Sequence, residues 1–100
     1  MLDTLTIDSF TPHKGSTFHL QVADGESLDL ELVEIGAMGA KPKEGRQAFS
    51  CVFRGPESAL LPQQIYPLSH AELGEMELFL VPLGPAGRET PGFLYEAVFT

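Results

Sequence analysis

The chain has 100 residues, 43% of them hydrophobic, and a formal net charge of −8. This length suits one domain whose core is large enough to fold without a metal or a disulfide, so the sequence predicts a single domain over residues 1–100. The negative field of such a chain repels phosphate backbones and anionic lipid, which disfavours nucleic acid and membranes as partners.

The sequence predicts no targeting signal. No apolar run approaches the roughly 18 residues of a spanning helix, and the first residues lack the basic-then-apolar order of a secretory signal. Cys51 is the single cysteine, so an intrachain disulfide is excluded. We therefore expect a protein that is cytoplasmic as synthesised, with export by another route left open.

The first half of the chain alternates apolar and polar residues with a period of two. After a short strand predicted between Leu5 and Phe10, apolar side chains alternate from Phe18 to Val22 and again from Leu28 to Leu32. The intervening Asp24-Gly25 is a strong hairpin signal, because both positions tolerate positive φ. This pattern predicts a hairpin with one apolar and one acidic face.

The alternation changes phase after Leu32, because Val33 and Ile35 now carry the apolar side chains. A β-bulge, which adds one residue to a strand, explains such a change. A strand buried on both faces is the alternative. We favour the bulge.

Residues 36–47 form the longest stretch without apolar periodicity, and three glycines and a proline indicate a loop. Lys41, Lys43 and Arg46 place half of the chain's six basic side chains there. Loops on rigid scaffolds often carry binding, so these three residues form a candidate partner-contact loop. A plain connector is the alternative.

Two strands are predicted after this loop. The first covers Phe49 to Phe53, and Gly55-Pro56 closes it. The second covers Gln63 to Ser69, and Pro67 within it suits an edge position or a bulge, since proline cannot donate to a ladder.

A helical turn is predicted next. Ser69 and Glu72 have the spacing of a capping box, which would begin one turn over Ser69–Leu73 that ends at Gly74.

The last third of the chain predicts two more strands. The segment from Met76 to Val81 is partly apolar on both faces and ends at Pro82, so we place this strand centrally in the sheet. A Gly/Pro-rich turn from Gly84 to Gly92 then leads to a strand from Phe93 to Phe99. The whole pattern predicts an all-β fold: a small antiparallel barrel or sandwich of six or seven strands, with at most one short helical turn.

Candidate chemistry is sparse. His13, His19 and His70 lack the common metal-ligand spacings, so we expect solvent-facing or edge-capping imidazoles. Cys51 is in phase with Phe49 and Phe53, which predicts an inert core thiol rather than a nucleophile.

An acidic cluster follows the first predicted strand, where carboxylates invite comparison with a calcium site. We interpret it instead as a solvated strand face that deters edge-to-edge aggregation. The cluster consists of Asp24, Glu26, Asp29 and Glu31. No catalytic, cofactor-binding or metal-binding residue is predicted.

Six motifs are spread over nearly the whole chain: Phe10-x-x-His13-x-Gly15-x-x-Phe18, Phe49–Pro56, Gln64-x-Tyr66, His70-x-x-Leu73-Gly74, Leu78–Pro82 and Tyr95–Phe99. In order and spacing they resemble a family of short, uncharacterised bacterial domains of unknown function. The resemblance implies a small β fold, transfers no catalytic residue, and implies an association with phage-tail-collar-like or surface-fibre proteins.

We therefore expect a non-enzymatic structural or protein-interaction module, whose partner is another protein or a second copy of the chain. A small-molecule or glycan-binding β-barrel is the alternative. Phenylalanines expected to fill the interior argue against that alternative: Phe10, Phe18, Phe49, Phe53, Phe79, Phe93 and Phe99.

Overall fold

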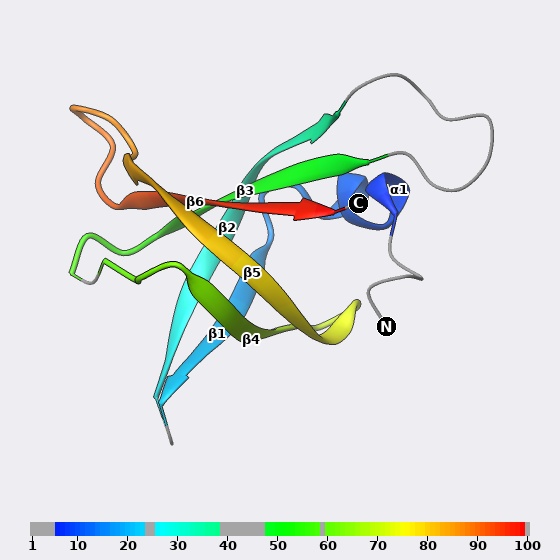
Figure 1. Cartoon of the computed structure of the whole chain (residues 1–100), viewed down its shortest axis with the longest axis horizontal. Helices are drawn as coiled ribbons and strands as arrows, with labels where there is room; N and C mark the ends of the chain where they lie inside the picture. The colour runs from blue at the N-terminus through cyan, green and yellow to red at the C-terminus, as the bar shows by residue number, and fades with distance from the viewer. Residues whose placement is uncertain (1–5, 24–25, 39–47, 59, 100) are drawn as a thin grey trace.

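The computed structural model describes residues 6–23, 26–38, 48–58 and 60–99. It contains a short helical segment followed by six strands (Figure 1). The elements are α1 (Ile7–Phe10), the 3-10 turn η2 (Thr11–His13), β1 (Thr17–Ala23), β2 (Glu26–Ala37), β3 (Phe49–Gly55), β4 (Gln64–His70), β5 (Gly74–Pro85) and β6 (Phe93–Phe99).

The six strands close into one antiparallel barrel in the order β1-β2-β3-β6-β5-β4, with β4 returning to β1. The predicted all-β fold is confirmed, and of the two predicted architectures the barrel is correct. Closure joins strands that are far apart in sequence, since β3 pairs with β6 from Phe49↔Phe99 to Gly55↔Phe93.

The predicted phase change in β2 is a bulge. The register of β2 against β3 shifts between Leu32 and Glu34, where the chain adds one residue to β2. The strand then continues through Gly36 and Ala37, so the loop predicted from residue 36 begins later than expected.

Inward side chains from all six strands pack with Phe10 of α1 into one buried cluster. The predicted core positions Phe49, Cys51 and Phe53 are fully buried. Phe79 is a correction to the predicted interior, because its side chain lies on the outer face of β5 and is 50% exposed.

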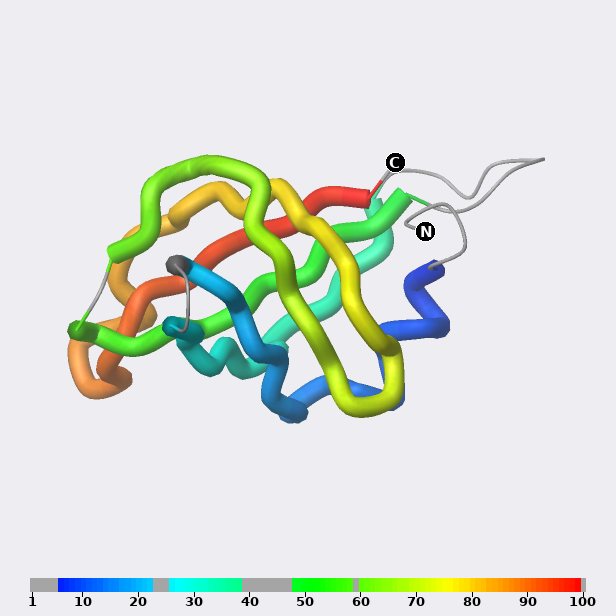
Figure 2. The backbone as a smooth tube through the Cα atoms, turned by 90° about the horizontal axis from the view of Figure 1, so that it is seen from below, coloured from blue at the N-terminus to red at the C-terminus, as the bar shows by residue number. Residues whose placement is uncertain are grey.

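Two segments cover opposite ends of the barrel (Figure 2). At one end α1 inserts Phe10, whose ring centroid lies 5.1 Å from that of Phe99 and 5.8 Å from that of Phe49. At the other end the connector before β4 places Leu61 in the core, where its N–H donates to the Tyr95 hydroxyl at 2.9 Å. The interior is therefore lined by side chains that pack on one another.

The strand predicted between Leu5 and Phe10 is wrong for the described part, because Ile7–Phe10 is helical. The Thr6 N–H donates to the Ser9 hydroxyl at 3.0 Å, which satisfies an N-terminal donor of the turn. A helical turn here lets Phe10 enter the core, whereas the alternating pattern of the sequence had suggested extension.

The helical turn predicted over Ser69–Leu73 is also wrong. His70 still belongs to β4, and only a tight turn connects it to β5 at Gly74. The backbone N–H groups of Glu72 and Leu73 donate to His70 Nδ1 at 3.1 and 3.3 Å, so a side chain takes the place that helical carbonyls would have.

Pro82 does not end β5, which continues to Pro85. The register against β6 shifts between Pro82 and Gly84, and such an irregularity accommodates a residue without an N–H.

Candidate functional site

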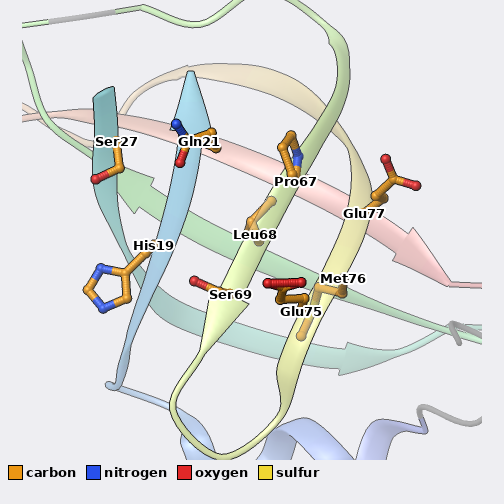
Figure 3. A pocket seen from close by; sticks show the side chains of 9 residues that line it. All are labelled: His19, Gln21, Ser27, Pro67, Leu68, Ser69, Glu75, Met76 and Glu77. Atoms are coloured by element: carbon orange, nitrogen blue, oxygen red, sulfur yellow. The ribbon is translucent and has the colours of Figure 1, made fainter. Parts of the chain in front are cut away.

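The outer wall of the barrel is hollowed between β1 and β4 (Figure 3). We call this depression, of about 750 Å³, the seam hollow. Its floor includes Leu68 and Met76, whose side chains are buried in the core. Its polar lining comes from four neighbouring strands: His19 and Gln21 of β1, Ser27 of β2, Ser69 of β4, and Glu75 and Glu77 of β5.

The hollow lies over the junction at which β1 and β4 pair over two positions only, His19↔Ser69 and Leu20↔Leu68. The next residue of β4 is Pro67, which has no N–H to extend the ladder. Meanwhile β1 stays paired with β2 as far as Ala23↔Glu26. The β1–β2 hairpin therefore leans away from β4, and Figure 3 shows the two strands diverging from His19 and Ser69 toward Gln21 and Pro67.

The strand that contains Pro67 was predicted to lie at an edge or to carry a bulge. In the closed barrel it forms, with β1, the junction that has the fewest paired positions. β4 pairs with β5 over all seven residues, from Gln64↔Leu80 to His70↔Gly74. On the side of β4 that faces β1, residues 64–67 have no ladder partner on β1.

The seam hollow is acidic. Glu75 and Glu77 lie on its β5 side, and none of the described residues that line it is a lysine or an arginine. On its β1 side, His19 Nδ1 lies 2.8 Å from the Asp29 carboxylate, so the one imidazole of the lining already has an acidic neighbour. The site therefore favours positive charge.

Beside the hollow, the same wall carries an exposed apolar pair. Ile65 of β4 and Phe79 of β5 lie directly opposite each other and are 61% and 50% exposed. Ile65 lies two residues before Pro67 and Phe79 two residues after Glu77, so they share the outward face of their strands with these residues. The sequence predicted β5 to be apolar on both faces, and in the structure its outer apolar side chain lies uncovered at the surface.

At the α1 end of the barrel, the structure brings Ser16 and His70 together, with Oγ and Nε2 3.0 Å apart. This pair resembles a nucleophile with its base, but the hydrogen-bond polarity excludes activation of the serine. His70 Nδ1 accepts two backbone N–H groups, so Nε2 carries the proton and donates to Ser16. The Ser16 hydroxyl in turn donates to the His13 carbonyl at 2.6 Å.

Of the two roles expected for the imidazoles, solvent-facing or edge-capping, His70 is not solvent-facing, because only 7% of its surface is exposed, and it caps the turn that ends β4. Its ring centroid lies 4.6 Å from that of His13 and 4.5 Å from that of Phe18. Burial, followed by the nearby His13, lowers the pKa of His70, and the Glu72 carboxylate opposes this shift without reversing it. No sequence spacing signals the cluster, because 57 positions separate the two histidines.

Cys51 lies in the core, where burial raises the pKa of its thiol to about 12. The predicted core position is confirmed, and a thiol with such a pKa carries negligible thiolate at neutral pH.

Two acidic residues of β2 are paired with a basic or imidazole side chain. Glu31 Oε1 accepts a hydrogen bond from Arg54 at 2.9 Å, and Asp29 lies beside His19. Within the described ranges, no group of three histidine, cysteine or acidic side chains is placed to hold a metal ion.

The candidate partner-contact residues Lys41, Lys43 and Arg46 lie outside the described residues, as does Asp24. The candidate site that the structure does show, the seam hollow with its apolar neighbours, was not predicted. Pro67 and the apolar outer position of β5 were its only sequence signals.

The described part of the chain has no helix long and apolar enough to cross a membrane. Fold and site together define a small closed β-barrel with a hollow on its outer wall. Residues 5–99 match a family described as a domain of unknown function (DUF6916), and the chain belongs to this family. No curated protein and no solved structure matches the chain.

Proposed function

We propose that this chain is a non-enzymatic protein-interaction module that binds a protein partner through the outer wall of β4 and β5. The observation that supports the proposal is the opposed pair Ile65 and Phe79, exposed side by side on a regular sheet surface. Aromatic side chains are enriched in interfaces, and adjoining apolar groups on an exposed surface are typical of docking sites.

The interior supports the same proposal indirectly. Phe10, Phe18 and the other inward side chains are buried against one another, so the core leaves recognition to the outside of the barrel. Burying apolar surface on the outer wall contributes about 25 cal/mol per Å², and a phenylalanine anchor supplies much of that area.

A foreign protein is favoured over a second copy of the chain. Two copies would each bring a net charge of −8, and Glu75 and Glu77 adjoin the apolar pair, so like charges would meet at a shared interface.

The test compares affinity capture by three immobilised proteins: the wild-type chain, an Ile65→Ser/Phe79→Ser variant, and a Val98→Ser control. Val98 is 48% exposed on β6, so the control removes an exposed apolar side chain at a different place. We expect the wild type and the control to retain the same protein and the double variant to lose it.

Light scattering of the purified chain supplies the second readout. A monomer that retains a partner through Ile65 and Phe79 supports the proposal, whereas equal capture by all three proteins contradicts it. The identity of the captured protein also tests whether the module belongs to a surface-fibre or phage-tail-like assembly.

A further inference from the structure

We infer that the outer wall of β4 and β5 selects a partner protein whose apolar contact is flanked on one side by lysine or arginine. One of these basic side chains enters the seam hollow from outside the barrel. The inference rests on the proposed function and deepens it, because it names the charge of the partner and the position of that charge beside the apolar contact.

The outward residues of β4 and β5 form successive pairs across the two strands. In order along the strands, these pairs are Ile65↔Phe79, Pro67↔Glu77 and Ser69↔Glu75. The positions between them, such as Tyr66 and Leu78, are buried in the core, so the paired side chains share the outer face. The first pair is apolar, whereas the other two each include a carboxylate. The wall therefore changes from apolar to acidic along its strands.

The seam hollow lies over the acidic part of this wall. Its described lining includes both members of the second and third pairs and neither Ile65 nor Phe79. Figure 3 shows the two carboxylates of this lining on β5, beside the hollow. The apolar pair is thus a raised contact, and the acidic pairs adjoin a recess.

The hollow is closed toward the core. Leu68 and Met76 at its floor are 2% and 5% exposed, and β1 and β4 stay paired at Leu20↔Leu68. An occupant therefore enters from solvent and remains outside the sheet. A lysine or arginine side chain can place its charged end in such a recess while its apolar stem lies over neighbouring surface.

Charge decides the occupant of the hollow. Glu75 and Glu77 supply the carboxylates, and none of the described lining residues is a lysine or an arginine. His19, the imidazole of the lining, already lies 2.8 Å from the Asp29 carboxylate. Electrostatic complementarity selects partners by charge, so basic groups beside the apolar contact are favoured and acidic groups are rejected.

Strand geometry fixes the distance between the two parts of the contact. Each strand residue rises about 3.3–3.4 Å, so Glu77 and Glu75 branch from the backbone about 7 and 13 Å from Phe79. On a partner helix, residues four and seven positions from an apolar anchor lie about 6 and 10 Å from it along the axis and share its face. Basic residues at those two positions therefore match the acidic pairs.

Three alanine-based helical peptides of about 20 residues provide the probe, because an isolated helix of that length can form in water. The first carries a phenylalanine followed by arginines four and seven positions later. The second has glutamates in place of the arginines, and the third has alanine in place of the phenylalanine.

The peptides are titrated at low salt into the isotope-labelled chain and followed by NMR. The first peptide should bind about tenfold or more tightly than either of the other two, because it alone combines the apolar anchor with the complementary charge. The amide signals of Glu75, Glu77 and Phe79 should shift most.

Variants of the chain localise the charge. Glu75→Gln/Glu77→Gln should weaken binding of the first peptide about three- to tenfold, since exposed ion pairs contribute modestly. Glu75→Lys/Glu77→Lys should make the glutamate peptide bind more tightly than the first peptide. The control Glu57→Gln/Glu89→Gln removes two exposed carboxylates near the β5–β6 turn, so it changes net charge equally and should leave binding unchanged.

Equal binding of the arginine and glutamate peptides, equal effects of the two glutamine double variants, or no binding of the first peptide would overturn the inference. A dimer of the chain that dissociates in the Ile65→Ser/Phe79→Ser variant would also overturn it, because a second copy would then occupy the wall. If the inference fails while that variant still loses partner capture, the proposed function stands. If neither capture nor peptide binding depends on the apolar pair, the proposed function fails and the inference fails with it.

Discussion

His70 is buried and hydrogen-bonded, although no motif in the sequence indicates this. Its neutral form accepts the N–H groups of Glu72 and Leu73, and its Nε2–H group donates to Ser16. Protonation would place a second N–H against the two backbone donors, so the neutral tautomer holds the β4–β5 turn against the segment that precedes β1.

We predict that stability falls as the pH drops from 7.5 to 5.5. Burial and the neighbouring His13 and His19 lower the pKa of His70, with Glu72 opposing, so the unfolded chain binds the proton more readily. The stabilisation is complete above the unfolded pKa of about 6.5 and is lost as the pH falls through it toward the lower folded value. Urea unfolding at both pH values measures the effect.

The control for this prediction is His70→Gln. It should lower the free energy of unfolding at pH 7.5 by about 1–2 kcal/mol through lost hydrogen bonds, and it should also flatten the pH dependence. An unchanged pH dependence in this variant would assign the effect to other groups.

At Gly92, the backbone conformation and close packing leave no room for a side chain. Its φ is +104°, and a Cβ there would lie 2.2 Å from the carbonyl oxygen of Gly55. Gly92 therefore packs directly against Gly55, which places the β5–β6 turn against the end of β3. Arg54 also donates a hydrogen bond to the Pro91 carbonyl there.

Gly92→Ala should therefore lower the free energy of unfolding by at least about 2 kcal/mol, measured by chemical denaturation. Gly36→Ala is the matched control, because Gly36 has an ordinary φ and open space at its Cβ position, so it should have little effect. Comparable losses in the two variants would contradict the packing argument.

At the scale of elements, α1 is too short to be stable by itself and acts as a plug for the barrel. A four-residue helix gains little from its own hydrogen bonds. Its stability comes from Phe10, which is fully buried against Phe18, Phe49 and Phe99.

Phe10→Ala should cost about 3–5 kcal/mol of stability, because truncation leaves a cavity at the end of the core. Phe79→Ala changes the same residue type on the outer wall and should cost less than about 1 kcal/mol. Thermal and urea unfolding of the two variants measure the contrast. Similar losses would mean that α1 does not seal the barrel.

At the scale of the whole molecule, the core cluster joins every strand, and both ends of the barrel are closed by packed segments. Tyr95 in β6 and Tyr66 in β4 both bond to the connector before β4, through Leu61 and Pro62 respectively. The connector is therefore coupled to the sheet.

We predict that the chain unfolds in one cooperative step. Circular dichroism, which reports the sheet, and tyrosine fluorescence, which reports the connector, should give the same midpoint in urea. Separate midpoints would divide the chain into independent units and contradict the single domain predicted from its length.

The sequence by itself determined the features that depend on neighbouring residues. Alternation identified most of the strands, the phase change after Leu32 located a bulge, and the phasing of Cys51 placed it in the core, because side-chain direction in a strand follows from position alone. Only the tertiary structure decided that the sheet closes, that Ile7–Phe10 is a helical plug, and that His13 meets His70. The seam hollow belongs to this second group, since it arises where β1 and β4, distant in sequence, meet over only two pairs. Such features depend on long-range packing, which can override the local pattern of a short segment.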